Sequence, residues 1–299
     1  SPRPTVRIGM IKAVLRRPIE PELGVSINGD SRVYSIPFLS GREIVNDTVG
    51  GVPIAVTWCP LCFTGIGYNR TIDGVEHTFG VSGKLILNAL VMYDHQSGSL
   101  WSQFLSRGVK GEFAGRDLEI VPIVQTTYGQ WLREHPDTAV LDKGRRGAFD
   151  QYDGYYIDDD AGVIGEANVD DRLARKDKVV GLGFENDPKA YPLSALDVNP
   201  VVNDRVAGED VVVFFQPSTE TALVYNRVVD GRRLEFDQVI GGDGTVLLRD
   251  RVTGTRFLPF TGRAVDGELA GAQLERVHSV VSFWFAWSDF FPEAELYEL

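Results

Sequence analysis

The only two cysteines of the chain, Cys59 and Cys62, are the residues most capable of chemistry, and they lie in one Cys-Pro-Leu-Cys motif. This spacing places two thiols close enough to share one metal ion or to exchange as a dithiol and disulfide. The motif follows an apolar, strand-like run, residues 52–58, and no helix N-terminus that would lower a thiol pKa is evident. The sequence therefore indicates a thiol site in a loop after a strand.

Three hypotheses for the thiol pair stay open. In the first, Cys59 and Cys62 bind one copper or zinc ion, since two thiolates with Met or His suit Cu(I) and two thiolates with two His suit zinc. In the second, they do redox or nucleophilic work, for which a proline between the cysteines is familiar and a nearby Lys84 would lower a thiol pKa. In the third, they form a small structural disulfide or a pair of buried thiols.

An internal repeat in the sequence helps to separate residues that serve the fold from residues that serve function. Residues 54–70 align without a gap on residues 211–227, an offset of 157 (211 minus 54), and matches continue on both sides. At that offset Cys59 meets Gln216 and Cys62 meets Thr219, so the second copy lacks both thiols. We expect residues kept in both halves to serve the shared fold, and reactive residues kept in one half to serve function.

Chemically able side chains gather in the first half between residues 80 and 103, whereas the matching residues 237–259 contain no Lys, Met, Asn or His. We predict that this stretch and the thiol motif form one site. The predicted catalytic residues are Cys59, Cys62, Ser82, Lys84 and Asp94; the predicted substrate-binding residues are Asn88, Trp101 and Gln103; the predicted metal ligands are Cys59, Cys62, His77, Met92 and His95.

Several of these residues also have a structural interpretation. Met92 lies in an apolar strand, where methionine is more often a core residue than a ligand. His95 sits at a turn, where a solvated imidazole is the ordinary expectation. Asp94 has a counterpart in Asp250 and stays a candidate because its neighbours differ between the halves.

The composition excludes some function classes. Of the 299 residues, 43% are hydrophobic, enough for a large core. The net charge of −12 argues against nucleic acid or an anionic membrane surface as partner. No run approaches the ~20 apolar residues of a membrane span. Neither a dinucleotide fingerprint nor a P-loop occurs, so we expect no nucleotide cofactor.

Many short, strand-like segments predict a mainly β fold with a minor α+β character. We predict two homologous β-rich repeats packed as one pseudo-two-fold body, each with one short helix near its end, residues 127–134 and 281–290; two independent β domains are the alternative. The predicted parts are an extended N-terminal arm, 1–21; a first, site-bearing repeat, 22–143; an acidic and aromatic connector, 144–177; and a second, degenerate and structural repeat, 178–299. We expect the connector to be a solvated loop whose rings lie on a neighbouring surface.

Distinctive motifs follow one another through the first half: EIVNDTVGG, VTWCPLC, YNR, TFGVSGKL, LVMYDHQSGSLWSQ, GEFAGRDL and a Trp followed by HPDT. Together they resemble the bacterial and archaeal family catalogued as domain of unknown function 3179. That family often has a His before the Glu of the first motif, where this chain has Arg42. The resemblance implies that the cysteines, Ser82, Lys84, Asp94 and Trp101 lie in the family's distinctive motifs. It also favours a secreted or periplasmic protein, and it implies no reaction.

These observations predict an enzyme of the oxidoreductase class that uses the thiol pair, with one bound copper or zinc ion, on a small-molecule substrate in the first repeat. In this hypothesis Lys84 and Asp94 orient the substrate. The alternatives are a thiol-redox enzyme and a non-catalytic module that binds or handles a metal.

Overall fold

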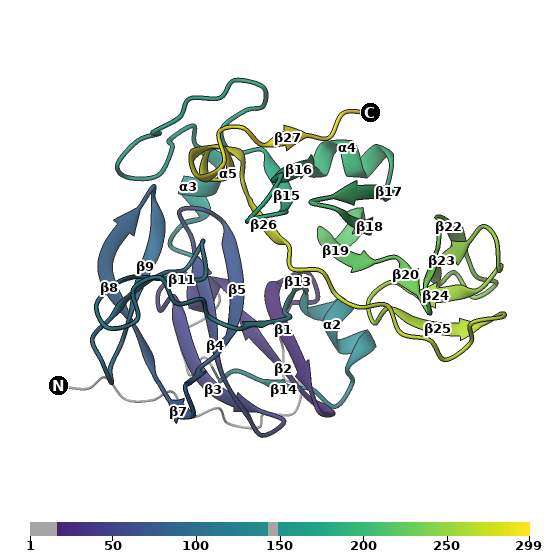
Figure 1. Cartoon of the computed structure of the whole chain (residues 1–299), viewed down its shortest axis with the longest axis horizontal. Coiled ribbons are helices and arrows are strands. Elements are labelled where there is room, and N and C mark those ends of the chain that lie inside the picture. The colour runs from purple at the N-terminus through teal and green to yellow at the C-terminus, as the bar shows by residue number, and fades with distance from the viewer. Residues whose placement is uncertain (1–16, 143–148) are drawn as a thin grey trace. The chain divides into compact units, whose positions relative to one another are not determined.

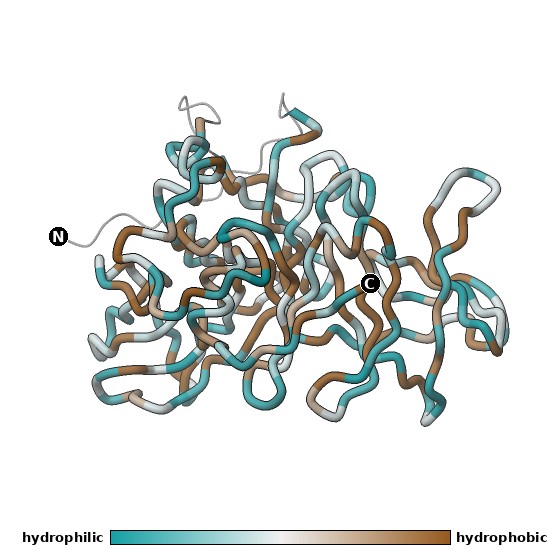
Figure 2. The backbone as a smooth tube through the Cα atoms, turned by 90° about the horizontal axis from the view of Figure 1, so that it is seen from above, coloured by the Kyte–Doolittle hydropathy of each residue, from teal (hydrophilic) through white to brown (hydrophobic). Residues whose placement is uncertain are grey.

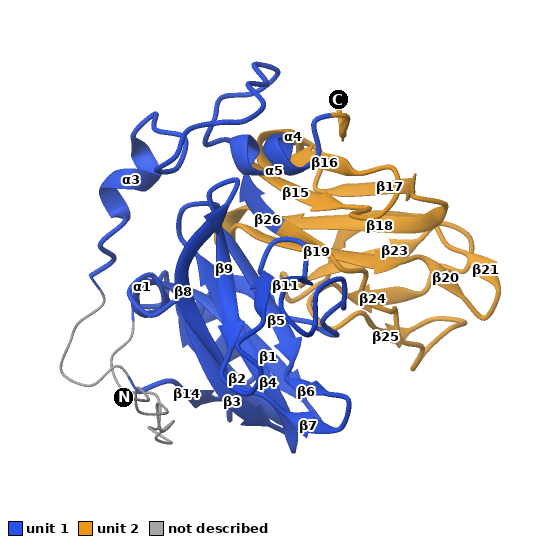
Figure 3. Cartoon of the chain, turned by 60° about the vertical axis from the view of Figure 1, so that its left-hand side comes forward, with its two compact units in different colours: residues 1–177, 281–292 blue, residues 178–280, 293–299 orange. Residues whose placement is uncertain are grey.

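The computed structural model describes residues 17–142 and 149–299. The chain forms two compact units, coloured blue and orange in Figure 3. The first unit contains the residues up to Asp177 together with residues 281–292, and the second contains residues 178–280 and 293–299. The segment 281–292 therefore belongs to the unit that carries the cysteines. Most of the predicted N-terminal arm, 1–21, lies outside the described residues.

The first sheet of the first unit is built on a hairpin. Strands β1 (Pro21–Ile27) and β2 (Asp30–Ser35) pair antiparallel around Asn28 and Gly29, whose φ values of +50° and +81° suit a two-residue hairpin turn. Strands β13 (Val124–Thr127) and β14 (Ala139–Val140) flank them in the order β13-β1-β2-β14.

The second sheet carries the thiol motif on its central hairpin. Its strands are, in order, β12 (Ile120–Val121), β5 (Thr64–Asn69), β4 (Val52–Cys59) and β3 (Ile44–Val49). The sequence of β4 is rich in β-branched and aromatic residues, and every residue from Ile54 to Cys59 is buried. The β4–β5 hairpin loop is therefore attached to a rigid, covered strand.

The third sheet has the order β11 (Arg107–Lys110), β10 (Leu100–Ser102), β9 (Ala89–Asp94) and β8 (Phe79–Ile86). Its β8–β9 hairpin turns at Leu87 and Asn88, whose φ values are +50° and +65°. Strand β8 contains a bulge between Val81 and Lys84. A small hairpin, β6 (Thr71–Ile72) and β7 (Val75–Glu76), precedes this sheet.

The helices of the described residues are short. In the first unit they are α1 (Ile36–Leu39), α2 (Tyr128–Glu134), α3 (Asp153–Ile157) and α5 (Trp284–Phe290). Helix α2 begins after Thr127, whose side chain accepts a hydrogen bond from the backbone N–H of Gln130, and it closely matches the predicted 127–134. Helix α5 begins three residues later than the predicted 281–290, because residues 281–283 extend strand β26 (Val280–Phe283).

The second unit has the same kinds of element as the first (Figure 1). One sheet contains β15 (Lys178–Leu182), β16 (Lys189–Pro192) and β27 (Glu295–Leu296), and another has the order β17 (Val201–Val206), β18 (Glu209–Gln216), β19 (Thr221–Asn226). The last four-stranded sheet has the order β22 (Phe236–Ile240), β23 (Val246–Asp250), β24 (Arg256–Leu258), β25 (Arg263–Asp266). The small hairpin is β20 (Val228–Val229) with β21 (Arg232–Arg233), and the helices are α4 (Leu193–Val198) and the 3₁₀ turn η1 (Pro217–Thr219).

Matching polar contacts occur within each unit. The Asn46 side chain donates to the carbonyl oxygen of Phe79 at 2.9 Å, and Asn203 donates to that of Phe236 at 2.8 Å. Tyr34 donates its hydroxyl to the carboxylate of Asp47, as Tyr191 does to Asp204. The predicted structural role of these shared polar residues agrees with their positions, since each ties neighbouring strands or loops together.

The chain is mainly β, as predicted, and its interior is apolar. Along the backbone, hydrophobic stretches alternate with hydrophilic ones, and many loops are hydrophilic (Figure 2). The largest fully buried side chains are aromatic and come from both units; they include Trp58, Trp101, Tyr68, Tyr225 and Trp287. Among the described residues, no helix has both the length and the apolar character needed to cross a membrane.

Candidate functional site

The Cys-Pro-Leu-Cys motif forms the tip of the β4–β5 hairpin. Cys59 is the last residue of β4, and Cys62 lies in the turn before Phe63, whose φ of +60° reverses the chain. The Thr64 hydroxyl donates to the carbonyl oxygen of Cys62 at 3.3 Å and fixes the end of the turn. Both cysteines are free thiols, with only 2% and 0% of their surface exposed. The thiols therefore lie in the interior on a rigid hairpin.

The two thiols form one hydrogen-bonded pair. Both sulfurs approach the carbonyl oxygen of Asn88, Cys59 at 3.7 Å and Cys62 at 3.3 Å, and a hydrogen bond joins the two side chains. Burial by itself would raise the pKa of Cys59, but the hydrogen bond from the Cys62 side chain and those from the backbone of Cys62 and Leu90 together outweigh burial and lower it. Burial and the neighbouring Cys59 raise the pKa of Cys62 well above its ordinary value. Of the two thiols, Cys59 is therefore the one expected to lose its proton first.

The loop is covered by the connector and by the segment 281–292. The Tyr155 hydroxyl donates to the carbonyl oxygen of Leu61 at 2.8 Å, and the backbone N–H of Phe283 donates to that of Cys62 at 2.9 Å. The ring of Phe63 packs within 5.2 Å of the rings of Tyr156 and Phe283, measured between centroids. The predicted placement of connector rings on a neighbouring surface is confirmed, and that surface is the thiol loop.

Asn88 fastens the connector over the thiols. Its side-chain oxygen accepts the backbone N–H groups of Val163 at 2.8 Å and Ile164 at 3.0 Å, and its amide donates to the carbonyl oxygen of Gly165 at 2.8 Å. A Cβ at Gly162 would come within 2.1 Å of the Asn88 side chain, so the connector fits here only with glycine. Asn88 was predicted to bind substrate, but in the structure its side chain binds the backbone of the connector.

Two carboxyl groups stand near the sulfurs and oppose their ionisation. The charge of Glu43 raises the pKa of Cys59, and that of Asp289 raises the pKa of Cys62. Burial in turn raises the pKa of both carboxyl groups. One oxygen of Asp289 accepts the backbone N–H groups of Ala167 and Asn168, while its other oxygen is buried with no hydrogen-bond partner among the described residues.

Of the other residues predicted to join the site, Gln103 lies at the base of the thiol hairpin. Its amide donates to the Thr57 hydroxyl at 3.2 Å and to the carbonyl oxygen of Thr64 at 3.1 Å. Ser82 lies in the β8 bulge and donates to the carbonyl oxygen of Val91 at 2.5 Å, and the exposed Lys84 gives its backbone N–H to the Ser82 hydroxyl.

Asp94, His77 and Trp101 form a separate buried cluster. Asp94 lies 3.1 Å from the His77 Nδ1 and accepts the Trp101 Nε1–H at 3.0 Å and the Ser97 hydroxyl at 2.7 Å. Burial would raise the pKa of Asp94, but these bonds, led by that of Trp101, outweigh burial and lower it. The hydrogen bonds of these side chains connect strands β9 and β10, the β9–β10 turn and the segment before β8, and none of them reaches the cysteines.

The remaining two predicted ligands face other partners. Met92 is buried on β9, opposite Val81 and Trp101 in the strand register. His95 is exposed and its ring bonds Thr78 and Tyr93. Across residues 17–142 and 149–299, no three or more His, Cys, Asp and Glu side chains gather into a group that could hold a metal ion.

Three contributors to the site were missed by sequence reasoning: Tyr155, Phe283 and Asp289. They come from the connector and from the segment 281–292, which lie outside the predicted first repeat. Tyr155 and Phe283 lie in two aromatic runs, 152–156 and 283–287, which the sequence shows. An alignment of the two repeats does not indicate that either run packs on the thiol loop.

Comparison with known proteins identifies the family. A family described as a protein of unknown function (DUF3179) matches residues 11–294. Searches of curated proteins and of solved structures gave no match. Because the match spans nearly the whole chain, this protein belongs to the DUF3179 family.

Proposed function

We propose that Cys59 and Cys62 form a redox-active dithiol/disulfide pair, and that the chain is a thiol-dependent oxidoreductase acting on small molecules. The observation that carries the proposal is the hydrogen-bonded pair of buried thiols with split pKa values, lowered at Cys59 and raised at Cys62. A nucleophile with a lower pKa and a resolving thiol that stays protonated until needed are what thiol–disulfide exchange requires.

The surroundings of the sulfurs favour this couple. Both its resting states, dithiol and disulfide, are uncharged, so neither carries the large cost of a buried charge. The carbonyl oxygen of Asn88 accepts bonds from protonated thiols and would repel a pair of thiolates. The carboxyl groups of Glu43 and Asp289 act in the same direction.

The exchange is written with a small-molecule disulfide as oxidant. The Cys59 thiolate attacks one sulfur of the substrate, forming a mixed disulfide and releasing one thiolate. The Cys62 sulfur, after losing its proton, attacks the Cys59 sulfur and releases the second thiolate. The two protons lost by the cysteines end on the two released thiols, and two electrons pass from the cysteine pair to the substrate.

Access to Cys59 requires movement of the chain that covers it, because only 2% of the residue is exposed. This movement must break the hydrogen bond of Tyr155 to Leu61 and the hydrogen bonds of Asn88 to the connector. The proposal therefore includes an opening of residues 155–165 before the first exchange step.

The donor set was also compared with the predicted metals. Zinc in proteins almost always takes four ligands, and in the described part of the chain the two cysteines belong to no group of three or more His, Cys, Asp and Glu side chains that could hold a metal ion. Cu(I) prefers soft thiolates, and two sulfurs can hold it alone, so a copper-binding module is the second candidate. In that case Cys59 and Cys62 would be its ligands, and the metal would supply one-electron redox chemistry.

The experiment is incubation of the purified chain with oxidised glutathione, followed by intact-mass measurement and a thiol assay. We expect wild type to lose two hydrogens while one disulfide becomes two thiols. Cys62→Ser should stop at a mixed disulfide on Cys59, and Cys59→Ser should react far more slowly. Ser82→Ala, remote from the bonds of the sulfurs, is the matched control and should behave as wild type.

Two outcomes would contradict the redox proposal. In one, both thiols of the folded chain stay reduced in excess oxidised glutathione, although they react fully in denaturant. In the other, titration against a Cu(I) chelator gives one tightly bound copper that is lost in Cys59→Ser, while exchange stays undetectable. The second result would establish the copper-binding module instead.

A further proposal concerns the origin of the two halves. We propose that they arose by duplication and that the first half alone kept the thiols. Matching contacts support it, since Tyr68 donates to the carbonyl oxygen of Gln103 as Tyr225 does to that of Pro259. The hairpin loops correspond too, because Phe63 and Glu220 both have positive φ, +60° and +46°. The pseudo-two-fold packing of the repeats stays a prediction.

A further inference from the structure

The second unit contains its own cavity, of about 620 Å³, although the sequence comparison assigned this half a structural role. A cavity of this size falls in the range of small-molecule sites. It lies beside strands β17 and β22, and its lining includes Asn199, Asp237, Gln238 and Tyr297. All of its lining residues belong to the second unit.

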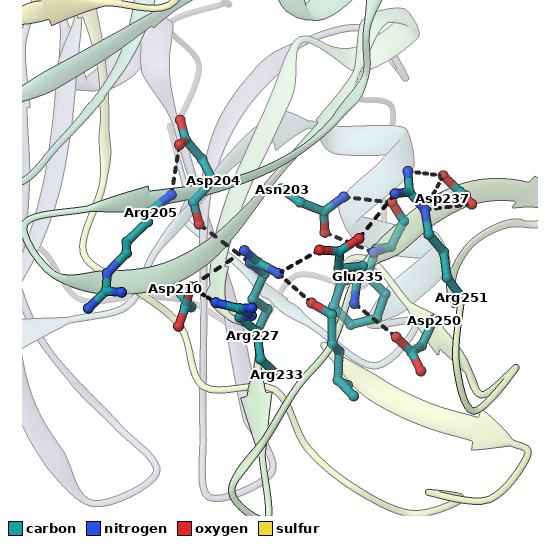
Figure 4. A network of polar contacts seen from close by, with 12 residues as sticks. Asn203, Asp204, Arg205, Asp210, Arg227, Arg233, Glu235, Asp237, Asp250 and Arg251 are labelled. Carbon is teal, nitrogen blue, oxygen red and sulfur yellow. Dashed lines mark hydrogen bonds and ion pairs between the residues drawn. The ribbon is translucent and has the colours of Figure 1, made fainter.

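The charges around the cavity are balanced. Its lining has three cationic side chains, Lys189, Arg227 and Arg251, and three anionic ones, Asp204, Glu235 and Asp237. Arg251 contacts Asp237 at 2.8 Å and Glu235 at 3.1 Å, and Lys189 contacts Asp204 at 3.0 Å. Figure 4 shows Arg227 between Asp204 and Glu235, and Arg251 facing Asp237. Since each cation already has a carboxylate, the cavity offers no unpaired charge to an ionic ligand.

The lining instead offers many hydrogen-bond donors and acceptors beside one partly exposed ring. The amide of Asn199 donates to the Tyr297 hydroxyl at 3.0 Å, and the Tyr297 ring lies 5.3 Å from that of Tyr191. Gln238 is exposed at the cavity and carries both an amide donor and an acceptor. Side chains that supply both a donor and an acceptor suit the hydroxyl groups of a ligand, because each hydroxyl donates one hydrogen bond and accepts another.

These polar groups are specific to the second unit. At the offset of 157 that aligns the halves, Asp237 meets Gly80, Gln238 meets Val81 and Asn199 meets Arg42. The first unit thus has a glycine, an apolar residue and an arginine where the second has a carboxylate and two amides. The same one-sided pattern that singled out the cysteines therefore singles out this cavity.

We propose that the cavity of the second unit binds a neutral polyhydroxylated ligand, a mono- or disaccharide. Asp237 and Gln238 would bond its hydroxyls from β22, and Asn199 with the Tyr297 ring would hold the opposite side. This site is separate from the thiol pair and does not depend on the redox proposal.

The test uses the full chain and saturation-transfer NMR with cellobiose, with glucuronate and inorganic phosphate as charged comparators. We expect cellobiose to bind in the millimolar range and the charged probes to bind more weakly. Gln238→Val and Asn199→Arg give the cavity the residues of the first unit and should each weaken cellobiose binding at least about tenfold, a loss of about 1.4 kcal/mol. Arg42→Asn, at the matching position of the first unit, is the control and should leave binding unchanged.

Three results would overturn the proposal. They are no cellobiose signal from a folded wild-type chain, cellobiose binding that both cavity variants retain, and stronger binding of phosphate or glucuronate than of cellobiose. The melting temperature of each variant separates loss of binding from loss of folding. The thiol exchange of the same variants should equal that of wild type, so failure here is distinguishable from failure of the redox proposal.

Discussion

At the scale of single residues, several hydrogen bonds to Cys59 decide which thiol of the pair ionises first. Hydrogen bonds from the Cys62 thiol and from the backbone of Cys62 and Leu90 together lower the pKa of Cys59, although the thiol is buried and lies near the carboxyl group of Glu43. In most reactive thiols a cation or a helix N-terminus has this role. Here Cys59 ends a strand, and a second thiol together with backbone N–H groups takes the place of the positive charge.

The first prediction follows from the side-chain hydrogen bond of Cys62. Cys62→Ala removes the donor, so the pKa of Cys59 should rise and its alkylation should shift to higher pH. Cys62→Ser keeps a hydroxyl donor and should restore most of the wild-type profile. The measurement is the rate of iodoacetamide modification of Cys59 against pH, followed by mass spectrometry. Identical profiles for Cys62→Ala and Cys62→Ser would mean that the side-chain hydrogen bond of Cys62 does not contribute to the pKa of Cys59.

A second prediction concerns His278 of the second unit, which stacks on Phe184 with ring centroids 4.6 Å apart. Burial and the nearby cation of Arg276 lower the pKa of His278 from 6.5 to about 4. The folded state therefore holds the ring neutral, while the unfolded state takes up a proton below pH 6.5. The contribution of the neutral His278 ring to the free energy of unfolding should be fully present above pH 6.5 and should be lost as the pH falls to about 4.

The check for His278 is urea denaturation of wild type and His278→Phe across this pH range. Phe keeps the ring stack but cannot be protonated, so its stability should fall less steeply with acid. An equal slope for both proteins would show that other groups cause the acid sensitivity.

At the scale of elements, the β8–β9 turn joins the thiol loop to the connector. The backbone carbonyl of Asn88 accepts both thiols, while its side chain binds the connector at three backbone groups. A turn residue with a left-handed φ of +65° is well suited to this, because asparagine tolerates that conformation and carries both a donor and an acceptor.

The third prediction is that Asn88→Ala loosens the connector. It removes three hydrogen bonds worth about 1 kcal/mol each, so the free energy of unfolding should fall by about 3 kcal/mol. Proteolysis within residues 149–177 should become faster, and Cys59 should be alkylated more readily. The control is Asn28→Ala, a hairpin asparagine with φ of +50° and a single exposed bond to the Gly50 carbonyl oxygen. Equal loss of stability in both variants would assign the effect to the backbone conformation alone.

At the scale of the whole molecule, the first unit is discontinuous in sequence. Residues 281–292 belong to it, and the ring of Phe290 stacks on that of Phe104 with centroids 4.3 Å apart and planes 9° apart. Phe283 packs on Phe63 at 5.0 Å and bonds the thiol loop. The candidate redox site is therefore complete only when residues 281–292 have joined the residues before Lys178.

The fourth prediction tests this arrangement with the fragment 1–177. Each large apolar side chain that loses its cover costs roughly 1.5–3 kcal/mol, so the fragment should melt well below the full chain and expose its cysteines to alkylation. A peptide of residues 281–292 added in excess should raise its melting temperature and slow the alkylation, and a peptide with Phe283→Ala and Phe290→Ala should not. A fragment with fully protected thiols would contradict the assignment of residues 281–292 to this unit.

The sequence alone determined the local features of this protein. Strand content follows from β-branched and aromatic runs such as β4, hairpins follow from turn residues such as Asn28 and Gly29, and helix α2 follows from its Thr127 cap. The family is also evident from motifs in order. Each of these depends on residues close together in the chain, so a linear reading can find them.

Only the tertiary structure decided which side chains meet. His77 and Trp101 are absent from the second half and Asp94 has different neighbours there, so all three were grouped with the cysteines, but they bond one another in a separate cluster. The covering groups of the thiols, Tyr155 and Phe283, come from segments far away in sequence. Alternation along a strand predicts burial but not the partner across the core, because that partner depends on how sheets and loops pack in space.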